Sequence, residues 1–291
     1  MARILCIGIA TLDIVNEVAT YPQEDDEIRI LSQQKYRGGN AANTAVVLSQ
    51  LGHQCSWAGT LVNSLADESD QQIILDDLKQ HQVNYDNCLL LTQGKIPTSY
   101  ITLCRDSGSR TICHYRDLPE YNFQAFKKIN LQIFDWLHFE GRNIEQVRKM
   151  MSYSKRLYPD MPISLEIEKM RDDIESLIQY ADVILFSRAY ALSQGYSDAR
   201  SFCLKISKQY PEPAIACAWG DSGAGAAINE AFFWQPVETI QTVDTLGAGD
   251  VFNAGIIDQY LKQHNIHRCL IYACQLATAK CAHKGLHFIT E

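Results

Sequence analysis

The sequence predicts a three-layer α/β fold, with helices on both faces of a mostly parallel central sheet and a second, smaller sheet beside it. Two patterns lead to this prediction. Short continuous apolar runs, typical of strands that are buried on both faces, alternate with helical patterns through the second half of the chain. In the first half, segments in which apolar and polar residues alternate indicate strands with one solvated face.

The central sheet is expected to begin with the apolar run 4–9. Further buried strands are expected at 136–139, 163–167, 183–186 and 214–219. Helical patterns lie between or after them, at 41–51, 143–157, 170–180, 198–209, 249–263 and 267–283. Ligands of such folds bind at the carboxyl ends of the strands. Four residues stand at or just past predicted strand ends and are candidates for a site: Asp13, Glu140, Glu166 and Trp219.

The smaller sheet is expected from the mixed strands 13–19, 27–37, 98–104 and 111–115, with a turn at Ser107-Gly108 between the last two. No linker rich in Pro, Gly or Ser divides the chain. We therefore expect one domain, 1–291, into which the strands of the smaller sheet (approximately 13–37 and 98–116) are inserted.

Composition excludes several classes of protein. Hydrophobic residues make up 46% and charged residues 21%, enough for a large core. A net charge of −8 argues against binding to nucleic acid or an anionic membrane. The ten cysteines contain no Cys-x-x-Cys pair, so a zinc or thioredoxin-like site has no support and reduced thiols are expected. The first apolar run is too short for a signal peptide or membrane span, which favours a cytoplasmic protein.

The strongest chemical signal is the glycine-rich string 243–253, VDTLGAGDVFN, which leads into a helical pattern. Small residues at Gly247, Ala248 and Gly249 let backbone amides turn toward one point, and a helix N-terminus suits a phosphate in transfer. Asp250 falls in the first turn, where its carboxylate is expected to be ionised and to accept a proton from an alcohol. A capped helix start would also explain a lone Gly-x-Gly-Asp, but the flanking Asp-Thr and Phe-Asn pairs make the string more specific.

The second signal is the string 37–43, RGGNAAN, at the start of a predicted helix. Two glycines permit close approach of the backbone to a ligand. Asn40 and Asn43 are three residues apart, so their amides can share one side of the helix entry and bind the hydroxyls of a sugar. An asparagine cap after a turn is the alternative, and the string alone does not decide between the two.

Together, the early Asp13, the string 38–43 and the string 244–250 (DTLGAGD) resemble the ribokinase-like, or PfkB, family of carbohydrate kinases. Their order and spacing match over nearly the whole chain. Further strings resemble the ketohexokinase group of that family, whose members phosphorylate fructose at its 1-hydroxyl. They lie at 21–29, 108–111, 138–143, 217–219 and 274–281.

The resemblance implies a ribokinase-like fold in which the smaller sheet is a lid, and it implies a role for each matching residue. Asp250 is the catalytic base, and the amides of 247–250 form the anion hole. The sugar is bound by Asp13, Gly39, Asn40 and Asn43, with Arg110 reaching over it from the lid. ATP lies near Trp219, Gly220 and Gly223, with Ala273, Ala277 and Cys281 of the last helix beside the adenine. Two lids clasp into a homodimer, and Asp25 reaches the partner's sugar site.

One departure from the family concerns metal binding. The wider family has an Asn-x-x-Glu motif that helps to place Mg²⁺, whereas this chain has Ser-Arg-Ala-Tyr at 187–190. The ketohexokinase group, which this chain resembles, also lacks this motif. Candidate Mg²⁺ residues are Glu140, Glu166 and Glu168, with solvated surface acids as the alternative. The sequence leaves a K⁺ requirement open.

The chemistry leaves three functions in view. The first is a ketohexokinase-like kinase that uses MgATP and a free sugar, because no basic cluster that could hold a sugar phosphate stands near Asp13, Asn40 or Asn43. The second is a kinase for ribose, adenosine or another small polyol. The third is a catalytically silent sensor of sugar or nucleotide, against which the intact Asp250 argues.

Overall fold

The computed structural model describes residues 1–63, 68–107 and 109–289, so Gly108 of the predicted turn lies outside the described residues. Its largest element is an eight-stranded sheet in the order β14-β13-β12-β11-β10-β9-β1-β4. The strands are β1 (Arg3–Ile7), β4 (Gln54–Ala58), β9 (Trp136–Glu140), β10 (Ile163–Ile167), β11 (Val183–Ser187), β12 (Ala214–Ala218), β13 (Ala224–Ile228) and β14 (Ala231–Gln235). All neighbours from β4 to β12 pair in parallel, and β13 pairs antiparallel with both β12 and β14. The predicted mostly parallel sheet is confirmed.

The predicted first strand starts one residue too late and ends two residues too late. It ends at Ile7 because the amide of Ile9 leaves the ladder and donates to Glu140 Oε2 at 2.9 Å. At Gly8 an added Cβ would lie 2.5 Å from the same oxygen, so the chain passes Glu140 where a larger residue would collide. This turn brings the end of β1 toward the site.

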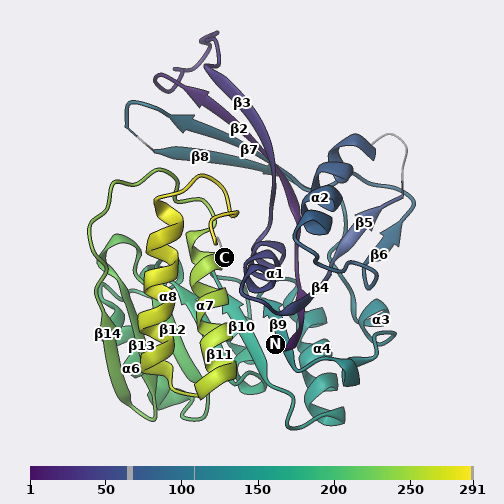
Figure 1. The fold of residues 1–291 in the computed structure, drawn as a ribbon, viewed down its shortest axis with the longest axis vertical. Coiled ribbons are helices and arrows are strands. Elements are labelled where there is room, and N and C mark those ends of the chain that lie inside the picture. The colour runs from purple at the N-terminus through teal and green to yellow at the C-terminus, as the bar shows by residue number, and fades with distance from the viewer. Residues whose placement is uncertain (64–67, 108, 290–291) are drawn as a thin grey trace.

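Helices cover both faces of the sheet, as predicted (Figure 1). One face carries α1 (Asn40–Gln50), α2 (Glu68–Gln80), α7 (Ala248–Gln263) and α8 (Ile266–Cys281). The other carries α3 (Phe123–Phe126), α4 (Ile144–Leu157), α5 (Arg188–Ser193), α6 (Ala199–Gln209) and two short 3₁₀ segments, η2 (Leu131–Ile133) and η3 (Ile174–Tyr180). The helix predicted over 170–180 is wrong in type and start: Asp173 has a left-handed φ of 60°, and only the 3₁₀ turns after it form.

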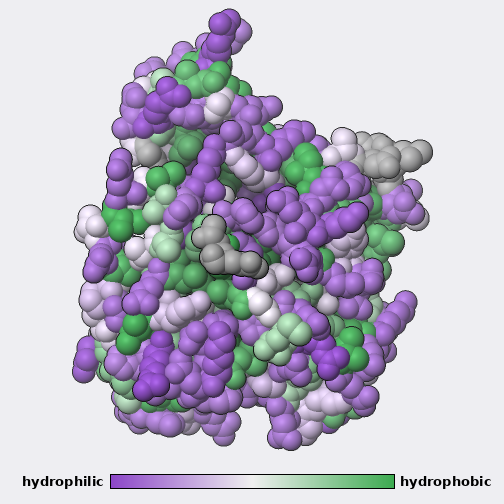
Figure 2. All heavy atoms as spheres, in the orientation of Figure 1, coloured by the Kyte–Doolittle hydropathy of each residue, from purple (hydrophilic) through white to green (hydrophobic). Residues whose placement is uncertain are grey.

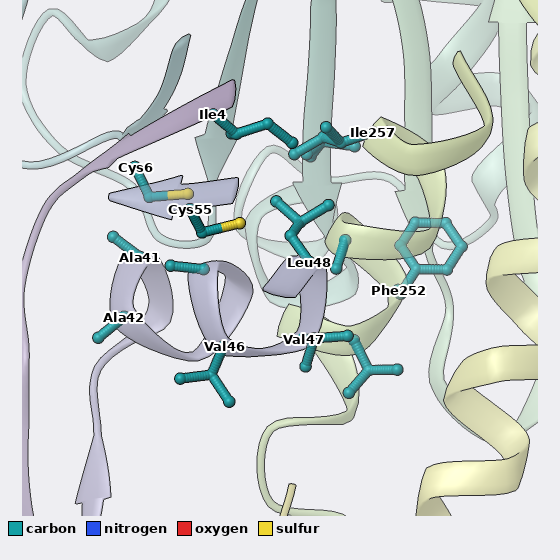
Figure 3. Packing of buried hydrophobic residues seen from close by; sticks show 14 of the residues in the cluster. Ile4, Cys6, Ala41, Ala42, Val46, Val47, Leu48, Cys55, Phe252 and Ile257 are labelled. Carbon is teal, nitrogen blue, oxygen red and sulfur yellow. The ribbon is translucent and has the colours of Figure 1, made fainter. Parts of the chain in front are cut away.

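The core between α1 and the sheet explains why two distant motifs meet. Small side chains of α1, among them Ala41 and Ala42, let the helix approach Cys6 of β1 closely (Figure 3). Further along, Leu48 packs in the same cluster as Ile257 of α7. The start of α1 is thereby held beside the start of α7.

The second sheet stands above the central one at the top of Figure 1. Its order is β3 (Ser32–Gly38), β2 (Thr11–Val18), β7 (Thr98–Cys104) and β8 (Arg110–Tyr115). The strand predicted to start at residue 27 begins only at Ser32, because Ser32 pairs with Glu17 and β2 ends one residue later. A third, two-stranded sheet joins β5 (Thr60–Val62) and β6 (Leu89–Leu91).

Hydrophilic residues predominate on the face shown in Figure 2, with hydrophobic residues in small separate groups. Such scattered apolar groups are normal for exposed surface. Among the helices that the structure describes, none combines the length and apolar character needed to cross a bilayer.

Candidate active site

The start of α7 has the geometry that the glycine-rich string predicts. Gly247 caps the helix with a φ of 78°, a conformation that favours glycine, and α7 begins at Ala248. Gly249 is exposed and has nothing within 4 Å of the place where a Cβ would stand. Asp250 lies in the first turn and is 6% exposed. Open backbone therefore stands directly beside a buried carboxyl group.

Asn43 of α1 holds that carboxyl group. Its Nδ2 donates to Asp250 Oδ2 at 2.6 Å, and its own Oδ1 accepts from Arg37. Arg37 is buried and also pairs with Asp77 of α2. Arg37 was not predicted as a site residue. Its position as a charged residue directly before two glycines could have indicated its role.

The charge state of Asp250 differs from the prediction. The pKa of Asp250 is raised to about 8, mainly by burial and also by the charges of Glu168 and Glu140, while the Asn43 hydrogen bond and the charge of Arg37 act in the opposite direction. The helix N-terminus contributes at most about 2 kcal/mol at such positions, too little to offset the loss of hydration. A carboxyl group with this pKa is mostly protonated at neutral pH, which differs from the expectation of an ionised carboxylate.

Glu166, at the end of β10, lies in the same cavity. Its Oε1 accepts from Asn40 and from Asn253, both at 3.0 Å, while its buried Oε2 has no partner among the described residues. Burial raises the pKa of Glu166 well above its usual range, and the charges of Asp250 and Glu140 add to this. The two asparagines that were predicted to act together therefore have different partners. Asn43 donates to Asp250, whereas Asn40 donates to Glu166 and Glu168.

The three predicted metal residues differ in how free they are. Glu140 is occupied, because it accepts from the Ile9 amide at 2.9 Å and from Arg142 at 3.4 Å. Glu168 accepts from Asn40 at 3.3 Å and pairs with Lys169. Among the described residues, no three His, Cys, Asp or Glu side chains are arranged to hold a metal. Mg²⁺ at phosphoryl-transfer sites is held by one or two carboxylates together with phosphate oxygens and waters, and Glu166, with its unpartnered Oε2, could supply one such carboxylate.

Asp13 and the two glycines facing it form the opposite wall. Asp13 is buried on β2 and accepts from Thr11 Oγ1 at 2.8 Å. A Cβ on Gly38 would lie 2.2 Å from Asp13 Oδ2, and one on Gly39, whose φ is 97°, would lie 2.4 Å from the Ile9 carbonyl. The glycines are therefore required by the space beside Asp13 and by the turn into α1.

Arg110 on β8 reaches across from the second sheet. Its Nη1 donates to Thr245 Oγ1 at 3.0 Å, which connects that sheet to the loop before α7. Arg142, Lys169 and Arg171 also line the cavity. The expectation of no basic cluster near the sugar residues is therefore wrong, because residues distant in sequence meet at this end of the sheet.

A cavity of about 510 Å³ joins these groups. Of the predicted sugar and catalytic residues, it is lined by Asp13, Gly39, Asn40, Asn43, Arg110, Gly247, Gly249 and Asp250. Ala248 does not line it, but its amide lies in the same turn. Asp25 is exposed in the loop between β2 and β3, with a φ of 65°, and stands outside the described lining of its own subunit's cavity.

The six residues predicted beside ATP lie outside the described lining of this cavity. Trp219 is buried with the Arg188 guanidinium 5.7 Å from its ring, and Gly220 and Gly223 form the turn after β12 with φ of 71° and 124°. Ala277 and Cys281 are half-buried on α8. Ala273 is fully buried, and a Cβ on Gly255 of α7 would lie 2.8 Å from its Cα. Ala273 therefore packs α8 against α7 and offers no surface to a nucleotide.

This fold and this site define a phosphotransferase that acts on a small polar alcohol. A family model described as pfkB family carbohydrate kinase matches residues 1–291, and the chain belongs to that family. It is an ATP-dependent sugar kinase of the ribokinase type. The predicted resemblance is confirmed.

Several relatives are similar to this chain over most of its length. The chain is 35% identical to ketohexokinase from Mus musculus, over 97% of each chain, and 26% identical to a fructosamine kinase from Bacillus subtilis, over 86% of this chain and 85% of the relative. A putative ribokinase from Agrobacterium tumefaciens has the same fold, with a TM-score of 0.85 at 21% identity over 99% and 94% of the two chains. An Arabidopsis thaliana ribokinase complexed with ribose and ATP gives a TM-score of 0.80 at 20% identity over 98% and 94%.

Proposed function

We propose that the protein transfers the γ-phosphoryl group of MgATP to the 1-hydroxyl of free D-fructose, giving fructose 1-phosphate and ADP. The observation that carries this is the meeting of Asp250, Asn43 and Asp13 in one cavity at the N-terminus of α7. The 35% identity to a ketohexokinase over nearly the full length supports fructose as the sugar.

In the proposed reaction the sugar hydroxyl oxygen attacks the γ-phosphorus, the bond from that phosphorus to the bridging oxygen breaks, and ADP leaves. The hydroxyl proton passes to Asp250, which must first be ionised. Asn43 holds the accepting carboxyl group in place from the other side. The amides of 247–250 face the phosphoryl oxygens and the helix N-terminus stabilises their charge.

Mg²⁺, when bound with ATP, neutralises phosphate charge and lowers the cost of ionising nearby carboxyl groups. Glu166, with its open oxygen, and Glu168 are the residues proposed to hold it, directly or through water. The basic residues at the cavity, Arg110, Arg142, Lys169 and Arg171, are proposed to face the triphosphate.

The same basic residues favour a second candidate, in which the acceptor is a sugar that already carries a phosphate. A direct test measures ADP release with fructose, ribose, adenosine and fructose 1-phosphate as acceptors. We expect kcat/KM for fructose to exceed the others by about 10-fold or more, since a site that pairs with sugar hydroxyls rejects acceptors that leave those groups unpaired. A preference for the phosphorylated sugar would refute the proposal, and no turnover with any acceptor would favour a sensor.

We also propose that two copies pair through the second sheet, which then acts as a lid. Tyr100 and Tyr115, on one face of that sheet, are 42% and 48% exposed, and Ile112 on the other face is 48% exposed. A sheet with exposed apolar residues is stabilised by a partner, and a two-fold pair is the commonest arrangement. Asp25 is proposed to complete the partner's sugar site rather than its own.

A further inference from the structure

Lys280 is a buried charge that the chemistry above does not use. It is the last residue but one of α8 and has no exposed surface. Its Nζ donates to the backbone carbonyl of Asp244 at 2.8 Å and lies 2.9 Å from Asp244 Oδ2. A buried ammonium group is costly unless it is paired and hydrogen-bonded, so both contacts with Asp244 are needed to hold it there.

Asp244 is in turn the centre of a small network. Its Oδ1 accepts from the amide of Leu246 at 2.8 Å, and its Oδ2 accepts from the amide of Gly285 at 2.9 Å. Although burial alone would raise it, the net pKa of Asp244 is lowered by Lys280 and these two amides. Cys281 accepts at its carbonyl from the amides of Val243 and Asp244. The end of α8 and the start of the loop before α7 are therefore joined at one point.

That loop carries the proposed anion hole, and its other side-chain contact described above is the hydrogen bond from Arg110 to Thr245 Oγ1. Thr245 and Gly249 are exposed, and Gly249 has open space around it. Four residues after Asp244 the chain enters α7, where the Ala248 amide donates to the Thr245 carbonyl at 3.2 Å. On the two sides of the loop, the amides of 247–249 are thus held by α7 itself and by the Asp244 network, with the contact from Arg110 to Thr245 between them.

We infer that Lys280 is a positioning residue for phosphoryl transfer: its ammonium group fixes Asp244 and, through it, the amides of 247–249 that face the transferred group. The inference rests on the proposed function of that loop. Lys280 also neutralises a carboxylate that would otherwise stand unpaired near the entering triphosphate. Both effects act on the step of transfer more than on sugar binding, because the hydrogen bonds described above for Asp13 and Asn43 do not involve Lys280 or Asp244.

The test compares Lys280→Met with Lys262→Met. Lys262 is also paired with an aspartate, Asp258, but in the last turn of α7, roughly 20 Å from its first turn. Lys280→Met is expected to lower kcat by about 10–100-fold with the KM for sugar changed less than about threefold, the effect of a small misplacement of transition-state contacts. Lys262→Met is expected to keep kcat within about twofold of the unaltered protein. Near-normal kcat in Lys280→Met would overturn the inference.

Rescue separates positioning from a general loss of structure. Lys280→Ala leaves room for a small amine, and at constant K⁺ concentration methylammonium is expected to restore kcat in a saturable way. Tetramethylammonium has no N–H to donate and is expected to have no effect. Absence of rescue in a folded Lys280→Ala protein would contradict the inference. Should neither Lys280 variant fold, Asp244→Asn is measured instead, and an unchanged kcat there would overturn it.

The two proposals fail in different ways. If the unaltered protein turns over none of the sugars, the proposed function fails. Hydrogen exchange at the Leu246 and Gly285 amides still tests the network, because both are expected to exchange faster in Lys280→Met while the Ile256 amide in the middle of α7 does not. Unchanged exchange at both amides would refute the role of Lys280 without any assay of activity.

Discussion

Replacing Asp250 by asparagine tests the base and its environment together. The amide keeps the size of the side chain and can still accept from Asn43, so the sugar site is expected to stay formed. It cannot take the proton of the sugar hydroxyl. General-base catalysis contributes about 10²–10⁴-fold, so we expect kcat to fall at least about 100-fold while the affinity for sugar, measured by calorimetry, changes little.

The same substitution is expected to stabilise the protein. The pKa of Asp250 is about 8 in the folded chain against 3.8 for an ordinary aspartate, so folding holds the proton more tightly than the unfolded chain does. That preference costs nothing below pH 4 and destabilises the folded state increasingly as the pH rises toward 8. A difference of one in pKa corresponds to about 1.4 kcal/mol, so a gain of at least about 2 kcal/mol is expected for Asp250→Asn at pH 8.5.

Thermal unfolding in buffer with chelator, at pH 4.5, 6.5 and 8.5, measures this. For a chain of this size each kcal/mol raises Tm by roughly 2–4 °C, so the variant should melt at least about 4 °C higher at pH 8.5, with a clearly smaller gain at the lowest pH. A gain that does not depend on pH would refute the reasoning about burial. A variant that keeps more than about a tenth of kcat would refute the role of the base.

Three further predictions concern other parts of the site. Glu166→Gln should raise the Mg²⁺ concentration for half-maximal rate about 10-fold or more, with the KM for sugar nearly unchanged; an unaltered Mg²⁺ titration would remove Glu166 from the metal site. Gly38→Ala should raise the KM for sugar about 10-fold or more, because its Cβ would stand 2.2 Å from Asp13 Oδ2; a normal KM would show that Asp13 can move freely. Asp25→Ala should raise the KM for sugar more than that for ATP, and mixing it with Asp250→Asn subunits should restore part of the activity. Heterodimers without such rescue, or a monomer by light scattering, would contradict the shared site.

Much of the fold could be predicted because its strands are buried on both faces. Runs such as Val183–Phe186 are apolar throughout, and a helical pattern follows most of these runs, so the parallel sheet is readable from the sequence pattern. The hairpin of β13 and β14 was missed. Its turn is formed by Asn229 and Glu230, both with positive φ, and contains no glycine from which a turn could have been predicted.

Most residues of the site could be predicted from the sequence, but their hydrogen-bond partners could not. Asp250 and Asn43 were named from their motifs, but which carboxylate each asparagine contacts depends on the register of α1 against α7, which no local pattern contains. The raised pKa of Asp250 could not be predicted, because the helix N-terminus is visible in the sequence and the depth of burial is not. Asn253, three residues after Asp250 on the same helix, could have been assigned from that spacing.

The hydrogen bond between Asn43 and Asp250 spans 207 residues of sequence. Ribosomes add about 5–20 residues per second, so α1 leaves the tunnel on the order of 10–40 s before α7 exists to meet it. During that interval the apolar side of α1 and the buried position of Asn43 have no partner, and chaperones that shield apolar surface have their best opportunity to bind. The nascent chain thus contains its proposed sugar-binding motif well before Asp250 has been synthesised. Activity should therefore appear in one late step and should not increase gradually with the length of the chain.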